Sequence, residues 1–431
     1  MVIVDEASQS DLWALPAVLR GKKILVVGDD KQVSPTGGFV DATWIDSIRA
    51  RWLQGQPFAS LLTPDRSLYD LASSVFAAHR VMLSEHFRCV QPIIGYSSRF
   101  YNNQLKPLRV PKAAERIDPP LIDVFLPEGV RHSKTNRAEA EFIAAEINAI
   151  LNDPRMAGRT IGVVSLLGNE QSKVVTEVIQ KRVGNHAELV RREFNAGDPS
   201  FFQGSERDIM FLTMVVDPTD CFALKGLMFE QRFNVAASRA RDRMYLVRSV
   251  GLEHLSPADV RRGLLEHFAK PHADADISKP LIERCESGFE REVFTALTDL
   301  GYRVTPQVPA GGFRIDMVVE GERDARLAIE CDGDAFHGPE RWPHDQARQR
   351  ILERAGWVFW RCFASAWVLR RNSILSELQE KLTAMGIEAI GQAERQPSVV
   401  QFRQWPEPEV PARPEAPSEN ADTLDSELTL T

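Results

Sequence analysis

The sequence predicts an α/β protein: parallel sheets covered by helices come first, a smaller α/β domain follows, and the chain ends in a disordered tail. Three observations lead to this prediction. Short apolar runs alternate with helical patterns over residues 1–250, as in a parallel sheet. The composition shifts at 271–279, and a new pattern of helix and strands begins near residue 287. Residues 404–431 are rich in Pro, Glu, Asp and Ser, which favours disorder.

Length and composition agree with this division. A chain of 431 residues, 43% of them hydrophobic and 26% charged, is a globular protein too long for one core. No apolar run approaches the ~20 residues of a membrane span and no signal-type leader opens the chain, so we expect no membrane partner and a cytoplasmic location. The expected domains, with the tail last, are 1–80, 81–270, 275–395 and 396–431.

Charge and cysteine content narrow the chemistry. The net charge of -8 does not exclude nucleic acid, because a local basic groove can bind phosphates on an acidic protein. The five cysteines lack the paired spacing of zinc sites or disulfide frameworks, and we expect reduced thiols at Cys89, Cys221, Cys285, Cys331 and Cys362.

The opening stretch places two carboxylates after an apolar run. Val2–Val4 is expected to be a buried strand, and ligands of parallel sheets bind beyond the carboxyl ends of the strands. Asp5 and Glu6 could therefore hold a hydrated Mg²⁺ and orient an attacking water. The alternative is an acidic turn after a core strand.

A second loop of the same kind follows. The apolar run 23–27 is expected to be a strand, ending in Gly-Asp-Asp-Lys-Gln at residues 28–32. The amide of Gln32 could contact a phosphate or a water, although such a loop is more often only a turn. Residues 36–66 are expected to be a loop or a helical insertion. Helices are predicted at 10–20, 67–78 and 92–100, and a strand at 80–89 that leads to Arg88, whose planar guanidinium suits phosphate oxygens.

The α/β rhythm resumes after residue 116. Strands are predicted at 122–125, 161–165, 209–216 and 243–247, and helices at 136–151 and 169–183. A further helix is expected to open at Gln231 and to present Arg232, Arg239 and Arg241. Taken alone, such a helix would be a solvated basic face.

Five motifs occur in one fixed order over about 240 residues. They are Asp-Glu-Ala-Ser-Gln, Gly-Asp-x-x-Gln-x-x-Pro, Glu-x-x-Arg, Gln-Gly-x-Glu-x-Asp and Arg-x-Asn-Val-Ala-x-Ser-Arg-Ala-Arg. Residues 1–250 thereby resemble the superfamily-1 helicases of the nonsense-mediated-decay type, whose two RecA-like domains bind ATP between them. The resemblance implies a partial first RecA-like domain and a complete second one.

The resemblance also implies a role for each motif residue. Asp5 would hold magnesium, Glu6 would act on the water, and Gln32 would sense the γ-phosphate. Arg88 and Arg239 would stabilise charge on that phosphate. The nucleotide would be lined by Gly204 and Glu206, with Arg232 and Arg241 supporting the same wall. Ser165 and Gln171 fall where such enzymes touch the nucleic-acid strand.

One expected motif is absent. The sequence contains no Gly-x-x-x-x-Gly-Lys-Ser/Thr, the P-loop whose amides and lysine hold the phosphates. We therefore expect the chain to be the C-terminal part of a longer helicase and to hydrolyse no ATP by itself. The rival interpretation is a short, ATP-inert nucleic-acid-binding module that positions the C-terminal domain.

Acidic residues recur in the last domain. A helix is predicted at 287–300, containing Glu290, with strands at 302–308, 313–319 and 326–333. A hairpin can bring Asp316 beside Glu330 and Asp332. Converging carboxylates are costly without a cation, which favours a divalent metal; the alternative is a hairpin with solvated acids.

Residues 288–367 resemble the PD-(D/E)xK nucleases, in particular the domains related to very-short-patch-repair endonucleases that are appended to such helicases. The resemblance implies Mg²⁺, or Mn²⁺, bound by Asp316, Glu330 and Asp332 with support from Glu290. Asp332 stands where a lysine is expected, and His337 could supply the proton-transfer or phosphate-contacting group. DNA is the preferred partner over RNA because the appended domain resembles DNA endonucleases.

Overall fold

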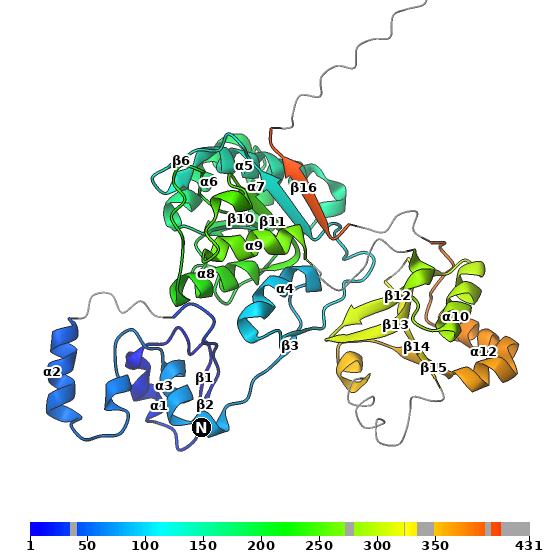
Figure 1. Cartoon of the computed structure of the whole chain (residues 1–431), viewed down its shortest axis with the longest axis horizontal. Coiled ribbons are helices and arrows are strands. Elements are labelled where there is room, and N and C mark those ends of the chain that lie inside the picture. Colours follow the sequence, from blue (N-terminus) through cyan, green and yellow to red (C-terminus); the bar gives the residue numbers. More distant parts are fainter. Residues whose placement is uncertain (35–40, 272–279, 323, 334–348, 393–397, 407–431) are drawn as a thin grey trace, which may run out of the picture.

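The computed structural model is described for residues 1–34, 41–271, 280–322, 324–333, 349–392 and 398–406 (Figure 1). Their strands form a six-stranded sheet, a four-stranded sheet and three two-stranded pairs. The six-stranded sheet lies between the N-terminal segment and the four-stranded sheet in Figure 1. No helix in this part of the chain is long and apolar enough to cross a membrane.

The N-terminal segment is built on two short parallel strands, β1 (Val2–Val4) and β2 (Ile24–Val26). Both strands were predicted, but the prediction that they are buried is wrong, because Ile3 is 57% exposed and Leu25 is 50% exposed. Within the described residues β1 and β2 pair only with each other, so both outer edges of the pair lack a partner strand.

Short helices surround this pair. The predicted helices 10–20 and 67–78 are seen as α1 and α3, and the predicted insertion 36–66 contains α2. Ser67 caps α3 by accepting a hydrogen bond from the Asp70 amide, while the Asp70 carboxylate accepts one in return. Their bounds are α1 Leu15–Val18, α2 Ala42–Trp52 and α3 Leu68–Val75.

The middle domain has a parallel sheet of order β16-β5-β11-β10-β8-β9. The parallel α/β class is thus confirmed. Apolar clusters cover both faces of this sheet, which explains why its strands are runs of apolar residues without alternation. The strands are β5 Leu121–Phe125, β8 Ile161–Ser165, β9 Asn195–Gly197, β10 Arg207–Thr213, β11 Ala240–Arg248 and β16 Val400–Gln404.

Strand β16 corrects the prediction that residues 396–431 form a disordered tail. Val400–Gln404 pairs in parallel with β5 at the edge of the sheet, and Trp405 packs edge-on against Phe142. The Arg403 guanidinium contacts Glu146 at 2.9 Å. Backbone pairing and one ring contact therefore order a segment whose composition alone favoured disorder. Residues 407–431 lie outside the described part of the chain.

Helices of the middle domain follow the predicted positions. Asn136 caps α5, where the sequence predicted a start, and Pro92 lies in the first turn of α4. Their bounds are α4 Gln91–Ser98, α5 Arg137–Asn152, α6 Asn169–Arg182, α7 His186–Arg191, α8 Leu227–Ala237 and α9 Val260–Ala269.

Two predicted elements are wrong. The expected strand 80–89 is reduced to β3 (Glu85–His86), because only these two residues find a partner strand, β4 (Lys106–Pro107). The helix expected to present three arginines ends at Ala237, so only Arg232 lies on it. Arg239 lies in the turn that follows, and Arg241 lies in β11.

The C-terminal domain is a four-stranded mixed sheet of order β12-β13-β14-β15 with helices packed against it. The predicted hairpins are confirmed as antiparallel pairs, while β14 and β15 run parallel. Two apolar clusters cover its faces. The bounds are α10 Gly288–Asp299, β12 Arg303–Ala310, β13 Phe313–Glu320, β14 Arg326–Asp332, β15 Phe359–Phe363 and α12 Ala364–Ala384.

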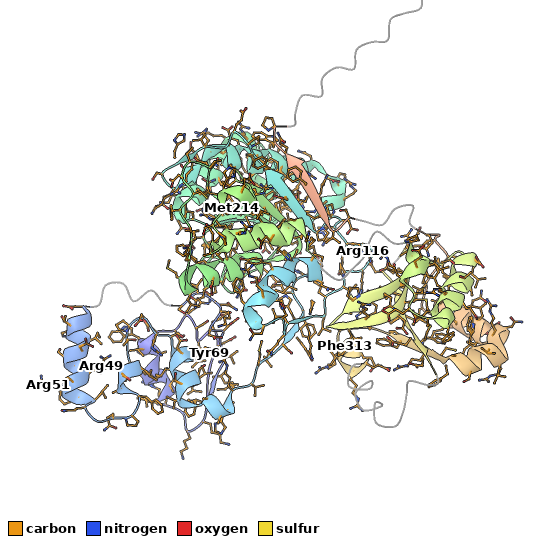
Figure 2. All side chains as sticks on the ribbon, viewed as in Figure 1. Arg49, Arg51, Tyr69, Arg116, Met214 and Phe313 are labelled. Carbon is orange, nitrogen blue, oxygen red and sulfur yellow. The ribbon has the colours of Figure 1, made fainter. Side chains whose placement is uncertain are left out.

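Residues 106–116, which we call the linking segment, join the middle domain to this sheet. Leu108 is 2% exposed and belongs to the same apolar cluster as Ile315 and Val318 of β13. The Arg326 guanidinium donates to the carbonyl of Val110 at 2.6 Å. Figure 2 labels Arg116, which pairs with buried Glu320 at 2.7 Å, where the two domains meet. A segment of the middle domain thus completes a core of the C-terminal domain.

Candidate functional sites

Residues from distant motifs meet between the N-terminal segment and the middle domain. The Arg239 guanidinium donates to the Gln32 side-chain oxygen at 3.5 Å. Gly204 adopts φ +78°, and a Cβ placed there would lie 4.0 Å from Glu6 Oε1. Two motifs within residues 5–35 and two within residues 203–241 therefore share one site, which we call the interdomain site.

Arg239 is the buried centre of the interdomain site. Its side chain donates to the Val235 and Ser205 carbonyls at 3.1 and 3.3 Å, and the residue is only 2% exposed. Burial, and then the charge of Arg88, lower the pKa of Arg239 to about 10, while the Glu6 carboxylate opposes that shift. Arg239 thus keeps its charge at neutral pH and is held in one orientation.

Three further charged residues form a second layer of the site. The Arg88 Nε donates to the Glu206 carboxylate at 2.6 Å. Arg241 approaches the other oxygen of Glu206 at 3.5 Å and also approaches Asp208 at 3.5 Å. Glu206 therefore lies between two arginines, and Arg88 would exchange this carboxylate for any anion that entered the site.

The two carboxylates that follow β1 are exposed to solvent. Glu6 has φ 51°, a left-handed conformation that is uncommon outside glycine and is found at functional sites. Its amide donates to the Asp5 carboxylate at 2.9 Å, and Gln9 donates to its side chain at 3.2 Å. Asp5 and Glu6 thus present oxygen atoms to water, as a hydrated Mg²⁺ requires.

The structure adds residues that the motifs did not assign. Asn234 of α8 donates to the Lys31 carbonyl at 2.8 Å and to the Tyr101 hydroxyl at 2.9 Å. The Tyr101 hydroxyl in turn donates to Asp29 at 2.5 Å. Gln231, one turn before Asn234, donates to the Asp30 carbonyl at 3.0 Å. The polar pair at i and i+3 on an otherwise buried helix was the signal available in the sequence.

His86 supports Arg88 from within the same turn. Its ring accepts a hydrogen bond from the Cys89 amide at 3.0 Å. Burial, and then Arg88 and Arg239, lower the pKa of His86 to about 4, so the ring is neutral at physiological pH. A neutral ring does not repel the two guanidinium groups beside it.

Arg232, by contrast, makes its described ion pair elsewhere. It approaches Asp198 at 3.5 Å and lines a pocket of about 380 Å³ together with Lys173 and the first residues of α6. Gln171 and Ser165 are fully buried, and Gln171 donates to the Asn136 carbonyl at 2.9 Å. These core contacts argue against the expectation that Gln171 touches a nucleic-acid strand. The buried Ser165 hydroxyl has no hydrogen-bond partner among the described residues, and its contact with a strand stays a prediction.

The acidic residues of the C-terminal domain form the second candidate site, at the carboxyl end of β14. Glu290 is 6% exposed and accepts hydrogen bonds from the Glu286 amide and the Gln307 side chain, both at 2.9 Å. Asp316 accepts one from the Cys331 amide at 2.7 Å. Burial, followed by the charges of Asp316 and Glu290, raises the pKa of the Cys331 thiol. Both acids thus lie near one side chain of β14.

Glu330 and Asp332 are each 5% exposed, and an arginine from the next strand faces them. Arg361 of β15 is in register with Glu330 and binds both oxygens of Asp332 at 2.8 and 2.9 Å. Asp332 stands where the resemblance led us to expect a lysine, and the guanidinium of Arg361 from β15 lies beside it. No local pattern predicts this pairing, because the partners lie on different strands.

Within the described ranges, no group of three or more His, Cys, Asp or Glu residues could hold a metal ion. The chemistry of the donors still suits a hard cation, since Glu290, Asp316 and Glu330 all offer carboxylate oxygens. Asp332 suits it less, because Arg361 already neutralises its charge. His337 lies outside the described residues.

Comparisons with known proteins agree with this two-part organisation. A family described as AAA domain (AAA_12) matches residues 64–250, and a restriction-endonuclease family (REase_MTES_1575) matches residues 289–382. The first range contains Arg88 to Arg241, and the second contains Glu290 to Arg361.

Two relatives carry helicase in their names. An uncharacterized ATP-dependent helicase of Mycoplasma pneumoniae, the MG140 homolog, is 22% identical over 419 residues, which cover 89% of this chain and 36% of that protein. The chain thus spans about a third of its length. The solved C-terminal domain of a possible DNA helicase from Lactobacillus plantarum is 15% identical, with 41% of this chain and 92% of that one covered and a TM-score of 0.26. Along the chain, similarity to an AAA domain over residues 64–250 is therefore followed by similarity to a restriction-endonuclease family over residues 289–382.

Proposed function

We propose that this chain is part of an ATP-dependent DNA helicase or translocase whose attached domain cuts DNA with Mg²⁺ or Mn²⁺. The observation that carries the proposal is the contact between Arg239 and Gln32, with Glu6 beside Gly204, because it gathers motifs from both sides of one site. DNA repair or defence against foreign DNA would suit such a pairing of activities. A cytoplasmic location stays a prediction.

The residues of the interdomain site suit the parts of nucleotide hydrolysis. Asp5 would hold Mg²⁺, which when bound neutralises phosphate charge. Glu6 would orient water, and Gln32 would contact the terminal phosphate. Arg88 and Arg239 would face the charge that develops there. The remaining nucleotide contacts are assigned to Gly204, Glu206, Arg232 and Arg241.

The acids of the C-terminal domain suit phosphodiester hydrolysis. A divalent cation would activate water and stabilise the leaving oxygen. Asp316 and Glu330 would bind it, and Glu290 would support them from α10. Asp332 would act through Arg361, whose guanidinium it fixes next to Glu330, and His337 is kept as the candidate for proton transfer.

The nuclease assignment is tested by nicking of supercoiled DNA with the whole chain. We expect cleavage that requires Mg²⁺ or Mn²⁺ and that falls at least a hundredfold in an Asp316→Ala, Glu330→Ala variant, because the metal then has no ligands. The matched control replaces two exposed acids of the same domain, Asp299→Ala and Glu388→Ala. Equal background cleavage by all three proteins would refute the assignment.

A second candidate function is an ATP-inert module that binds nucleic acid and positions the nuclease. The carboxylate of Glu206, which already occupies Arg88, favours it. We expect this chain to release no phosphate from ATP, with or without DNA. Measured DNA-stimulated hydrolysis that Glu6→Gln abolishes would instead make the chain itself an ATPase.

A further inference from the structure

Helix α12 carries an exposed apolar pair at a break in its first half. Val368 is 79% exposed and Leu369 is 80% exposed, although both follow Trp367, which is 1% exposed. The next residue, Arg370, has φ -139° and ψ 34°, so the helix is kinked there. We call residues 368–371 the α12 knuckle.

The knuckle is held firmly by what precedes and follows it. The Trp367 indole donates to the Glu292 carboxylate at 3.1 Å, and the helix is buried again at Ile374. The guanidinium of Arg371 lies 5.5 Å from the Trp367 ring centroid. The apolar pair is therefore presented to solvent from a fixed base.

The two arginines of the knuckle carry positive charge that no carboxylate balances. Arg370 and Arg371 are exposed, and neither has an acid within ion-pair distance in the described part of the chain. Two other exposed arginines of the same domain are paired with acids, Arg314 with Glu286 at 2.7 Å and Arg354 with Glu85 at 3.1 Å. The knuckle is thus suited to an anionic partner.

The knuckle lies close to the acidic site. Phe363, the residue before α12, is in register with Asp332 of β14. Helix α12 begins at the next residue, Ala364, so the knuckle follows the carboxyl end of β15 by one to two helical turns, beside the carboxyl end of β14.

We propose that the α12 knuckle is the surface by which the nuclease domain binds duplex DNA. Arg370 and Arg371 contact phosphates, and Val368 and Leu369 contact sugars or base steps in a groove, as apolar wedges flanked by arginine do. A duplex combines these two chemistries in one partner, whereas an apolar protein surface would leave both arginines unpaired. The inference rests on the proposed nuclease function and adds where its substrate is held.

The test measures binding of the whole chain to a short fluorescein-labelled DNA duplex by anisotropy, in EDTA and over a range of salt concentrations. Each lost phosphate contact lowers the slope of log K against log salt by about 0.9. We therefore expect Arg370→Ala, Arg371→Ala to lower the slope by about 2 and the affinity roughly tenfold. Replacement of both by lysine should restore the slope, because lysine keeps the charge.

Matched controls separate the knuckle from charge and helix effects. Asn372→Ala, Ser373→Ala changes the next exposed residues of α12, and Arg155→Ala, Arg191→Ala removes two exposed arginines of the middle domain. Both should bind within twofold of the parent. Val368→Ser, Leu369→Ser should weaken duplex binding without changing the salt slope, because no phosphate contact is lost.

Each outcome decides the inference. An unchanged slope and affinity in the arginine variant would refute it, as would a change of oligomeric state without DNA in the serine variant, which would make the knuckle a protein interface. Knuckle-dependent binding by a chain that does not nick DNA would leave this inference standing and refute the nuclease proposal. If the arginine variant nicks DNA with an unchanged KM, the nuclease proposal stands and this inference is refuted.

Discussion

The middle domain contacts its two neighbours in opposite ways. Towards the N-terminal segment the contacts described above are polar, and they include hydrogen bonds from α8 to backbone carbonyls, such as Asn234 to Lys31 and Gln231 to Asp30. Towards the C-terminal domain the linking segment inserts Leu108 into an apolar cluster of the neighbouring sheet. One contact is polar and the other is part of a core.

The polar contact with the N-terminal segment can therefore open more easily than the apolar contact with the C-terminal domain. A hydrogen bond contributes only about 0.5–1.5 kcal/mol, because water replaces it when the surfaces part. A buried leucine contributes roughly 1.5–3 kcal/mol, and water gives nothing back. The N-terminal segment can therefore move when a ligand binds at the polar contact, while the C-terminal domain stays attached to the middle domain.

The strongest test of the comparison is Leu108→Ala. We expect the free energy of unfolding of the C-terminal domain to fall by about 2–5 kcal/mol, because the substitution leaves a cavity between two domains. Urea denaturation can be followed by the fluorescence of buried Trp357 and Trp360. Leu369→Ala, at an exposed leucine of the same domain, should change this free energy of unfolding by less than about 0.5 kcal/mol. Equal effects would mean that the linking segment is only a surface contact.

A pH titration tests the point where the two contacts join. The His86 carbonyl accepts a hydrogen bond from the Leu108 amide at 2.8 Å, and its ring lies beside Arg88. Its pKa falls from 6.5 when unfolded to about 4 when folded, so only the unfolded state takes up a proton in between. Stability is therefore full above pH 6.5 and declines towards pH 4, by at most about 1.4 kcal/mol per pH unit. His86→Gln should flatten this decline, and an equal slope in parent and variant would contradict it.

The polar contact is tested by Asn234→Ala. Loss of its two hydrogen bonds should weaken the docking of the N-terminal segment by about 1–2 kcal/mol, because the Lys31 carbonyl keeps access to water. Weaker docking would be seen as faster amide hydrogen exchange over residues 1–34, with unchanged exchange in β12–β15. Asn148→Ala on exposed α5 is the control. Exchange that rises equally in both regions would show that the two contacts are one unit.

The smallest effect is expected at an exposed ion pair that accompanies the apolar contact. Arg354 lies 3.1 Å from Glu85, and its side chain is 66% exposed. Arg354→Ala should change the unfolding free energy of the C-terminal domain by no more than about 1 kcal/mol in the same urea experiment. If the unfolding free energy fell as much as in Leu108→Ala, the ion pair and not apolar burial would hold the C-terminal domain to the linking segment.

The sequence predicted those features that repeat locally. The strand 161–165 and the helix from Asn169 appear as expected, because local apolar patterns determine them. Motif order also led us to place Gln32 and Arg239 in one site, and the two side chains lie 3.5 Å apart in the structure.

Features that depend on distant partners were not predicted. Val400–Gln404 becomes a strand only because β5 offers a free edge, and nothing in its composition encodes that edge. Arg361 reaches Asp332 only because β14 and β15 are parallel and in register. Ile3 and Leu25 are exposed because, in the described residues, nothing packs closely on their face of the β1–β2 pair. In each case tertiary pairing, which local patterns do not contain, decided the outcome.

The linking segment also orders the events of folding. Val110 and Arg326, which are hydrogen-bonded, lie 216 positions apart, so the segment leaves the ribosome long before the sheet that it completes. Contacts at such separation form late and slow the last folding step. The four-stranded sheet of the C-terminal domain therefore folds against a segment of the middle domain that is already synthesised. A fragment that starts at residue 275 would lack Leu108, which completes the apolar cluster of this sheet.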